Sequence, residues 1–136
     1  DAGKMPVPDS FASKMTLHCS FEHFEGDADI RFIRESCRVL KFGGKLCILP
    51  LYMHRFYAIQ TDPLAYKGNF IFGEDATIYY ARGWGERHGR YYDVKHFMSR
   101  IVQNMGDLKL KLFFVENAKD VHPSCYLRFI ALFEKE

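Results

Sequence analysis

The stretch that decides the fold covers residues 9–51 and reads DSFASKMTLHCSFEHFEGDADIRFIRESCRVLKFGGKLCILPL. Residues 11–18 supply the apolar and β-branched side chains of a strand. Residues 45–51, KLCILPL, form a continuous apolar run and not an alternating one. Such a run is typical of a strand that is covered on both faces, as in a parallel sheet.

A helix is expected between these two strands, over residues 28–40. Asp27 is a suitable N-cap, because its carboxylate can accept from free backbone N–H groups. Apolar residues three or four positions apart share one face of this helix: Ile30, Ile33, Cys37 and Leu40. Gly43-Gly44 is expected to end the helix. Strand, helix and strand then form a βαβ unit with a right-handed crossover, so the predicted fold class is α/β.

The C-terminal third predicts one more helix and two strands. The helix covers residues 94–105, begins at the N-cap Asp93 and has apolar residues at i, i+3, i+4, i+7, i+8 and i+11. Residues 107–117 alternate between leucine and lysine, as expected for a strand with one wet face at a sheet edge. Residues 125–135 are mostly apolar at both odd and even positions, so both faces of a strand would be apolar. They predict an inner strand, antiparallel to the preceding one.

The segment at about residues 52–91 is rich in aromatic residues and glycine, and it fits none of these patterns. It is interpreted as an insertion into a single domain of residues 1–136. Residues 52–60 suggest a short helix and residues 76–84 a strand.

Composition limits the possible partners and the compartment. The chain has 136 residues and a formal net charge of +2, without a block of lysine and arginine, so nucleic-acid binding is not expected. No apolar run approaches the length of a membrane span. The four cysteines form no C-x-x-C pair and no HExxH motif is present, so no metal site is predicted. Free thiols are favoured over disulfides, which indicates a reducing, cytoplasmic location.

The same residues resemble a known family. Residues 9–51 are similar to the fourth strand, the following helix and the fifth strand of Rossmann-type S-adenosylmethionine-dependent methyltransferases. Phe21-Glu22-His23 stands where that family often has a Leu-Glu-His-like turn. Residues 38–44, RVLKFGG, resemble its Arg-Val-Leu-Lys-Pro-Gly-Gly-like motif, with Phe42 in place of proline. The closing helix and the antiparallel strand pair match the family by element order only.

The resemblance implies a sheet and a cofactor. The family sheet has the strand order 3-2-1-4-5-7-6, so a chain that starts at the fourth strand keeps 4-5-7-6 and exposes residues 11–18 as an edge. S-adenosylmethionine is the implied cofactor, and the implied contacts are Asp1, Ala2, Leu17 and His18. Asp1-Ala2 resembles the family's Asp-Ala pair, whose acidic residue accepts from the adenine amino group. The family's Gly-rich loop is absent from this sequence, so the chain alone is expected to lack most of the cofactor site.

The candidate catalytic residues are His18, Glu22 and His23, which follow the first strand. Ligands in open α/β sheets bind outside the carboxyl ends of the strands, and these residues could accept a proton from a nucleophile there. Ordinary loop structure remains the alternative for all three. Candidate substrate contacts lie after the fifth strand and before the last helix: Tyr52, His54, Arg55, Arg87 and His88. For the arginines and His88, a solvated basic loop is the alternative.

Two functions follow from this reading. The first is methyl transfer from S-adenosylmethionine to a small molecule, with the 52–91 insertion shaping the acceptor pocket. The second is a non-catalytic, methyltransferase-like module that serves interaction or dimerisation. A homodimer through the exposed strand at residues 11–18 is predicted, because its unpaired N–H and C=O groups invite pairing with another chain.

Overall fold

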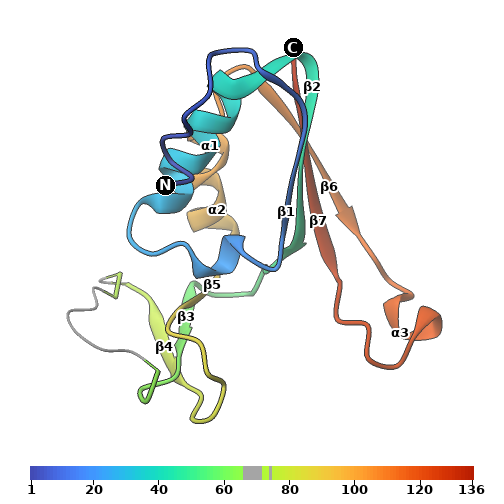
Figure 1. Cartoon of the computed structure of the whole chain (residues 1–136). Helices are drawn as coiled ribbons and strands as arrows, with labels where there is room; N and C mark the ends of the chain where they lie inside the picture. Colours follow the sequence, from blue (N-terminus) through green and yellow to red (C-terminus); the bar gives the residue numbers. More distant parts are fainter. Residues whose placement is uncertain (66–71, 74) are drawn as a thin grey trace.

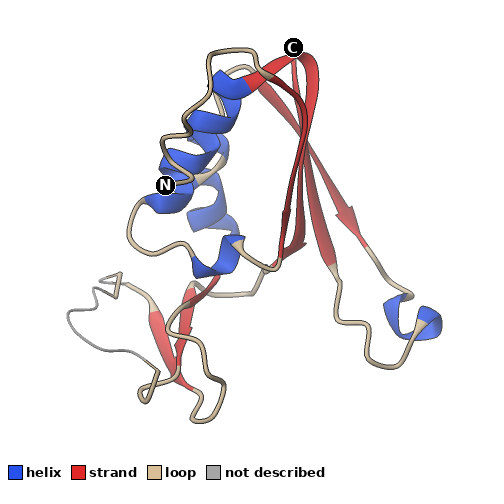
Figure 2. Cartoon of the chain, viewed as in Figure 1, coloured by secondary structure: helices blue, strands red, loops and turns tan. Residues whose placement is uncertain are grey.

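The larger of two sheets carries the fold (Figures 1 and 2). The computed structural model describes residues 1–65, 72, 73 and 75–136, and within them this sheet has the order β1-β2-β7-β6. The strands are β1 (Ala12–His18), β2 (Leu40–Leu51), β7 (Phe129–Lys135) and β6 (Leu108–Phe114). β1 runs parallel to β2, and β7 is antiparallel to both β2 and β6. These four segments therefore have the order that the family resemblance implied.

Both longer helices, α1 (Ala28–Val39) and α2 (Val94–Arg100), lie on one face of this sheet (Figure 1). α1 buries Phe32 and Ile33, and α2 and the residue that follows it bury Phe97 and Ile101. They pack with the inward side chains of the strands, which are Leu46, Ile48, Leu108, Ala131 and Phe133. Burial of this apolar surface drives the assembly of the layer.

The glycine pair has another role than the predicted one. α1 ends at Val39 and β2 begins at Leu40, so Gly43 and Gly44 lie inside the strand and do not end the helix. The register between β1 and β2 shifts at this point. Gly43 has φ +71°, and a Cβ on Gly44 would lie 2.7 Å from the carbonyl oxygen of Lys41. The pair therefore allows an irregular strand start that a side chain would block.

Three further expectations need correction, and the predicted cap at Asp93 is confirmed. Asp27 occupies the N-cap position, but its side chain makes no capping hydrogen bond. Asp93 does cap α2, since its carboxylate accepts from the His96 N–H at 2.7 Å. The helix predicted over residues 94–105 is α2 followed by a short 3-10 turn, η2 (Val102–Asn104). β2 is not covered on both faces, because Cys47 and Leu49 are only partly buried.

The 52–91 segment forms the second sheet in the described residues, with the order β4-β3-β5. Its strands are β3 (Ala58–Thr61), β4 (Thr77–Tyr80) and β5 (Gly89–Tyr91). The strand expected over residues 76–84 is confirmed by β4, whereas the short helix over residues 52–60 is wrong. The backbone there is extended and Met53 bridges to Tyr92, which binds the insertion to the end of β2. Residues 66–71 and 74 of the insertion lie outside the described residues.

Smaller elements complete the chain. η1 (Phe21–His23) follows β1, and α3 (Ala118–Val121) lies between β6 and β7, where the sequence suggested only a connection. β7 begins at residue 129 and not at residue 125. In β6, Lys109 and Lys111 are exposed, as the alternation predicted. Among the described helices, none is both long and apolar enough to cross a membrane.

Candidate functional site

The carboxyl ends of β1 and β2 lie side by side and open onto a cavity. His18 pairs with Leu49 in the β1–β2 register, and the Cys19 N–H donates to the Leu49 carbonyl at 3.0 Å. A cavity of about 160 Å³ lies at this edge. Its lining comes from η1, the end of β2, the insertion and the loop before β7: Cys19, Glu22, His23, Tyr52, Trp84, Glu86, Gly89, Tyr91 and Tyr126. Three of the predicted site residues therefore meet around one cavity.

Glu22 is the buried acid of this cavity. Its exposed fraction is 7%, and its Oε2 has no hydrogen-bond partner in the described chain. Nε2 of His23 lies 3.8 Å from Oε1. A carboxylate oxygen that is buried without a partner is costly, which is a feature more typical of a binding site than of a purely structural residue.

His23 and His88 are held by backbone carbonyls. His23 Nδ1 donates to the His88 carbonyl at 2.5 Å, and His88 Nδ1 donates to the Glu22 carbonyl at 2.9 Å. A carbonyl oxygen only accepts, so both Nδ1 atoms carry the proton. Nε2 of a neutral His23 is then left as an acceptor on the side of Glu22. Burial and the nearby Arg90 lower the pKa of His88 to about 4, which keeps this imidazole neutral near pH 7.

Tyrosine rings form the walls of the cavity. Burial, together with the charge of Glu22, raises the pKa of Tyr52 and of Tyr91. The two rings are 5.3 Å apart. The Tyr126 hydroxyl lies 3.2 Å from Cys19 Sγ, and this hydrogen bond raises the pKa of Tyr126. These phenols are therefore neutral near pH 7, and they surround Glu22 with rings and hydroxyl groups.

The other predicted contacts lie at the margin. His18 is exposed, and its Nε2 lies 3.5 Å from Cys19 Sγ. His54 and Arg55 are exposed beside neighbouring hollows, where the Arg55 guanidinium stands 5.4 Å from the Phe56 ring centre. Arg87 forms a bidentate ion pair with Glu25, at 2.5 and 2.9 Å. The structure thus brings Glu22, His23 and Tyr52 together in the lining of one cavity, which does not include His18, His54, Arg55 or Arg87.

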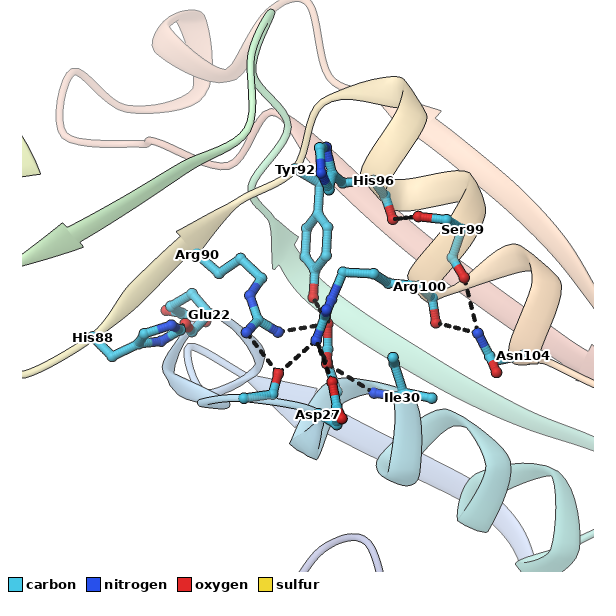
Figure 3. Close-up of polar contacts among 12 residues, drawn as sticks. Glu22, Asp27, Ile30, His88, Arg90, Tyr92, His96, Ser99, Arg100 and Asn104 are labelled. Atoms are coloured by element: carbon cyan, nitrogen blue, oxygen red, sulfur yellow. Dashed lines mark hydrogen bonds and ion pairs between the residues drawn. The ribbon is translucent and has the colours of Figure 1, made fainter. Parts of the chain in front are cut away.

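An ion cluster that the sequence did not predict lies beside Glu22 and His88 (Figure 3). Asp29 is fully buried and receives Arg90 Nη1 at 2.6 Å, Arg100 Nη2 at 2.7 Å and the Tyr92 hydroxyl at 2.6 Å. Burial opposes the charge of Asp29, but the hydrogen bond from Arg100 and the charge of Arg90 hold its pKa below the ordinary value. The cluster joins the start of α1 to β5 and to α2. No local sequence signal pairs residues 61 to 71 positions apart.

The N-terminal residues fit one end of the implied cofactor. Oδ1 of Asp1 accepts from the Gly3 N–H at 2.9 Å, and the carboxylate is exposed, so its other oxygen can accept from an amino group. Ala2 and Leu17 are partly buried against the hydrophobic core. An accepting carboxylate together with apolar side chains suits the adenosine end of S-adenosylmethionine. The described residues contain no cluster of three or more metal-ligating side chains.

Comparison with known proteins identifies the fold. The sequence matches no family model, and no curated protein matches it. The structure is similar to an S-adenosylmethionine-dependent methyltransferase from Methanosarcina mazei, with a TM-score of 0.58 and 13% identity, over 99% of this chain and 64% of that one. It is also similar to a putative S-adenosylmethionine-dependent methyltransferase from Listeria monocytogenes, with a TM-score of 0.57 and 9% identity, over 99% of this chain and 66% of that one.

A methyltransferase of the same dependence from Mesorhizobium loti gives a TM-score of 0.55 and 12% identity, over all of this chain and 67% of the other. The chain therefore spans about two thirds of the length of these structures. At such low identity the likeness concerns the fold. The resemblance inferred from residues 9–51 is confirmed at that level: the chain has the α/β fold of Rossmann-type S-adenosylmethionine-dependent methyltransferases.

Proposed function

We propose that this chain takes part in methyl transfer from S-adenosylmethionine to a small molecule. The observation that carries the proposal is the cavity at the carboxyl ends of β1 and β2, where Glu22, His23 and Tyr52 meet. Open α/β sheets bind ligands at this edge, and the chain shares its fold with methyltransferases.

Each residue has a role in this proposal. Asp1, Ala2, Leu17 and His18 contact the adenosine end of the cofactor, which when bound supplies an electrophilic methyl group. Tyr52 and Glu22 orient the acceptor, and His23 Nε2 accepts the proton that the acceptor loses. His88 fixes the ring of His23 through its carbonyl. His54, Arg55 and Arg87 border the entrance for the rest of the acceptor. Alignment of nucleophile and methyl group supplies much of the rate, so a strong base is not required.

Isothermal titration of S-adenosylhomocysteine into the 136-residue chain tests this proposal. Micromolar binding that weakens about tenfold in Asp1→Asn would support the proposal, because a charged acceptor contributes on the order of 1.5 kcal/mol to a hydrogen bond. Asp107→Asn, at the turn before β6, is the matched control and should leave the affinity unchanged. The absence of heat up to millimolar ligand would contradict cofactor binding by this chain.

A second candidate is a non-catalytic module that associates through β1. The observation in its favour is that β1 is an edge of the four-stranded sheet and, within the described residues, pairs only with β2. Exposed edges recruit further strands. Light scattering from 10 μM to 1 mM tests for a homodimer. A dimer together with no binding of S-adenosylhomocysteine would favour the module, and a monomer over the whole range would contradict it.

A further inference from the structure

The cavity at the ends of β1 and β2 holds a carboxylate that the protein does not satisfy. Oε2 of Glu22 is buried and has no hydrogen-bond partner in the described chain. The arginines nearby form ion pairs with other carboxylates. Arg87 pairs with Glu25, and Arg90 and Arg100 pair with Asp29. His88 is neutral near pH 7, since its pKa is about 4. His23 Nε2 lies 3.8 Å from Oε1, beyond hydrogen-bond distance.

The walls of the cavity add to its preference for a cation. Trp84, Tyr52, Tyr91 and Tyr126 line it, and a second carboxylate, Glu86, stands in the same lining. The faces of such rings carry negative potential and attract ammonium groups, tryptophan most strongly. Among the described residues, no arginine or lysine lines the cavity. Acids and aromatic rings without an arginine or lysine form a site for a small organic cation.

The cavity has room for a small ligand. Its volume of about 160 Å³ is well above what a single water molecule needs. This admits the end of an alkylammonium chain with its few non-hydrogen atoms. The remainder of a larger acceptor would extend toward the hollow lined by Tyr52, His54 and Tyr126.

We infer that the methyl acceptor is an aliphatic amine, whose ammonium group is bound by Glu22 among these rings. The inference rests on the proposed function and names its substrate class. The bound ammonium gives one proton to His23 Nε2, which leaves a neutral amine with a free electron pair. The nitrogen then forms the N–C bond to the methyl group as the C–S bond breaks and its electron pair stays on sulfur. His23 is partly exposed, so it returns its proton to solvent.

Titration of the cofactor-free chain with butylammonium chloride tests the inference without methyl transfer. Trp84 is the only tryptophan of the chain and lines the cavity, so its fluorescence reports binding directly. 1-Butanol is the matched neutral probe, with a hydroxyl group in place of the ammonium group. We expect a millimolar Kd for butylammonium and at least tenfold weaker binding of 1-butanol, because so small a ligand has few atoms with which to gain affinity.

Two variants sharpen the result. Glu22→Gln keeps the shape of the side chain and removes its charge, and it should weaken butylammonium at least tenfold while leaving 1-butanol unchanged. Glu136→Gln removes one exposed carboxylate from the C-terminus and should leave both probes unchanged. If Glu22→Gln does not fold, the comparison of the two probes on the unmodified chain still decides.

The outcomes separate the two proposals. Equal binding of both probes, or no binding of butylammonium, would overturn the amine site even if S-adenosylhomocysteine binds, and methyl transfer would then require another acceptor. Selective binding of butylammonium that depends on Glu22 would support the amine site even if S-adenosylhomocysteine does not bind.

Discussion

His23 and His88 are linked through each other's backbone. The His23 ring donates to the carbonyl of His88 at 2.5 Å, and the His88 ring donates to the carbonyl of Glu22, next to His23, at 2.9 Å. Sixty-five positions separate the two residues in the chain. These two hydrogen bonds hold η1 against the segment that enters β5. They therefore fix the relative positions of the βαβ unit and the insertion, which both line the cavity.

The neutral state of His88 predicts how stability depends on pH. Its folded pKa is about 4, and an unfolded histidine titrates near pH 6.5, so the unfolded chain binds more protons between these values. This contribution to stability is complete above about pH 6.5 and is lost as the pH falls toward 4. It amounts to roughly 3 kcal/mol, since one pKa unit corresponds to about 1.4 kcal/mol. Urea unfolding followed by Trp84 fluorescence between pH 4 and 7.5 measures it.

His88→Asn should flatten this pH dependence, because asparagine keeps a donor for the Glu22 carbonyl and does not titrate. His54→Asn is the matched control: it removes an exposed histidine and should leave the slope unchanged. If the free energy of unfolding of His88→Asn falls with decreasing pH as steeply as that of the unmodified chain, another group causes the loss of stability at low pH.

The ion cluster around Asp29 predicts that substitutions of its members lower the free energy of unfolding by different amounts. Asp29→Asn leaves Arg90, which is 3% exposed at its side chain, without its buried counter-charge. We expect a loss of about 3–5 kcal/mol in the free energy of unfolding, the range for a buried pair with one partner removed. Tyr92→Phe removes one hydrogen bond to the same carboxylate and should cost about 1–2 kcal/mol. Denaturant unfolding at pH 7 compares them.

Equal losses in Asp29→Asn and Tyr92→Phe would contradict this ranking. The cluster would then act as one hydrogen-bond network and not through the charge of Asp29. Arg100→Lys provides the intermediate case, because it keeps the charge while losing the forked contacts with both oxygens of Asp29.

The larger sheet was predictable because its signals are local. The apolar run of β2, the helical spacing of α1 and the leucine–lysine alternation of β6 each lie within a dozen residues. The errors arise where a distant contact overrides local pattern. Gly43-Gly44 follows a helix as a stop signal would, but the neighbouring strand β1 draws Leu40 into the sheet directly after Val39. The 52–60 stretch is extended because it pairs with β5 and with Tyr92, far along the chain.

The site was predictable only in part for the same reason. Glu22 and Tyr52 follow the two parallel strands, so the rule that ligands bind at their carboxyl ends identifies them. Trp84, Tyr91 and Tyr126 reach the cavity from the insertion and from the loop before β7, and nothing in the spacing of those residues shows it. The orphaned oxygen of Glu22 is a property of packing alone, and therefore only the structure reveals it.

Arg38 connects the RVLKFGG motif to the N-terminal loop, and this contact predicts how the loop responds to mutation. Its guanidinium donates to the carbonyls of Val7 and Met5 at 3.0 and 3.2 Å, and it also pairs with Asp9 and Glu35. Arg38→Met should therefore release the loop that carries Asp1. We expect trypsin to cleave after Lys4 about tenfold faster, and the affinity for S-adenosylhomocysteine to fall with it. Mass spectrometry of timed digests measures the cleavage.

Lys41→Met is the matched control, because it removes an exposed cation from the same motif, and no hydrogen bond or ion pair of its side chain is seen in the described chain. It should leave both the cleavage rate at Lys4 and the affinity unchanged. If Arg38→Met is cut at the rate of the unmodified chain, the loop is held by its apolar contacts, such as Met5 against the core, and not by the guanidinium. Faster cleavage with unchanged affinity would instead separate the loop from the cofactor, and would contradict the role assigned to Asp1.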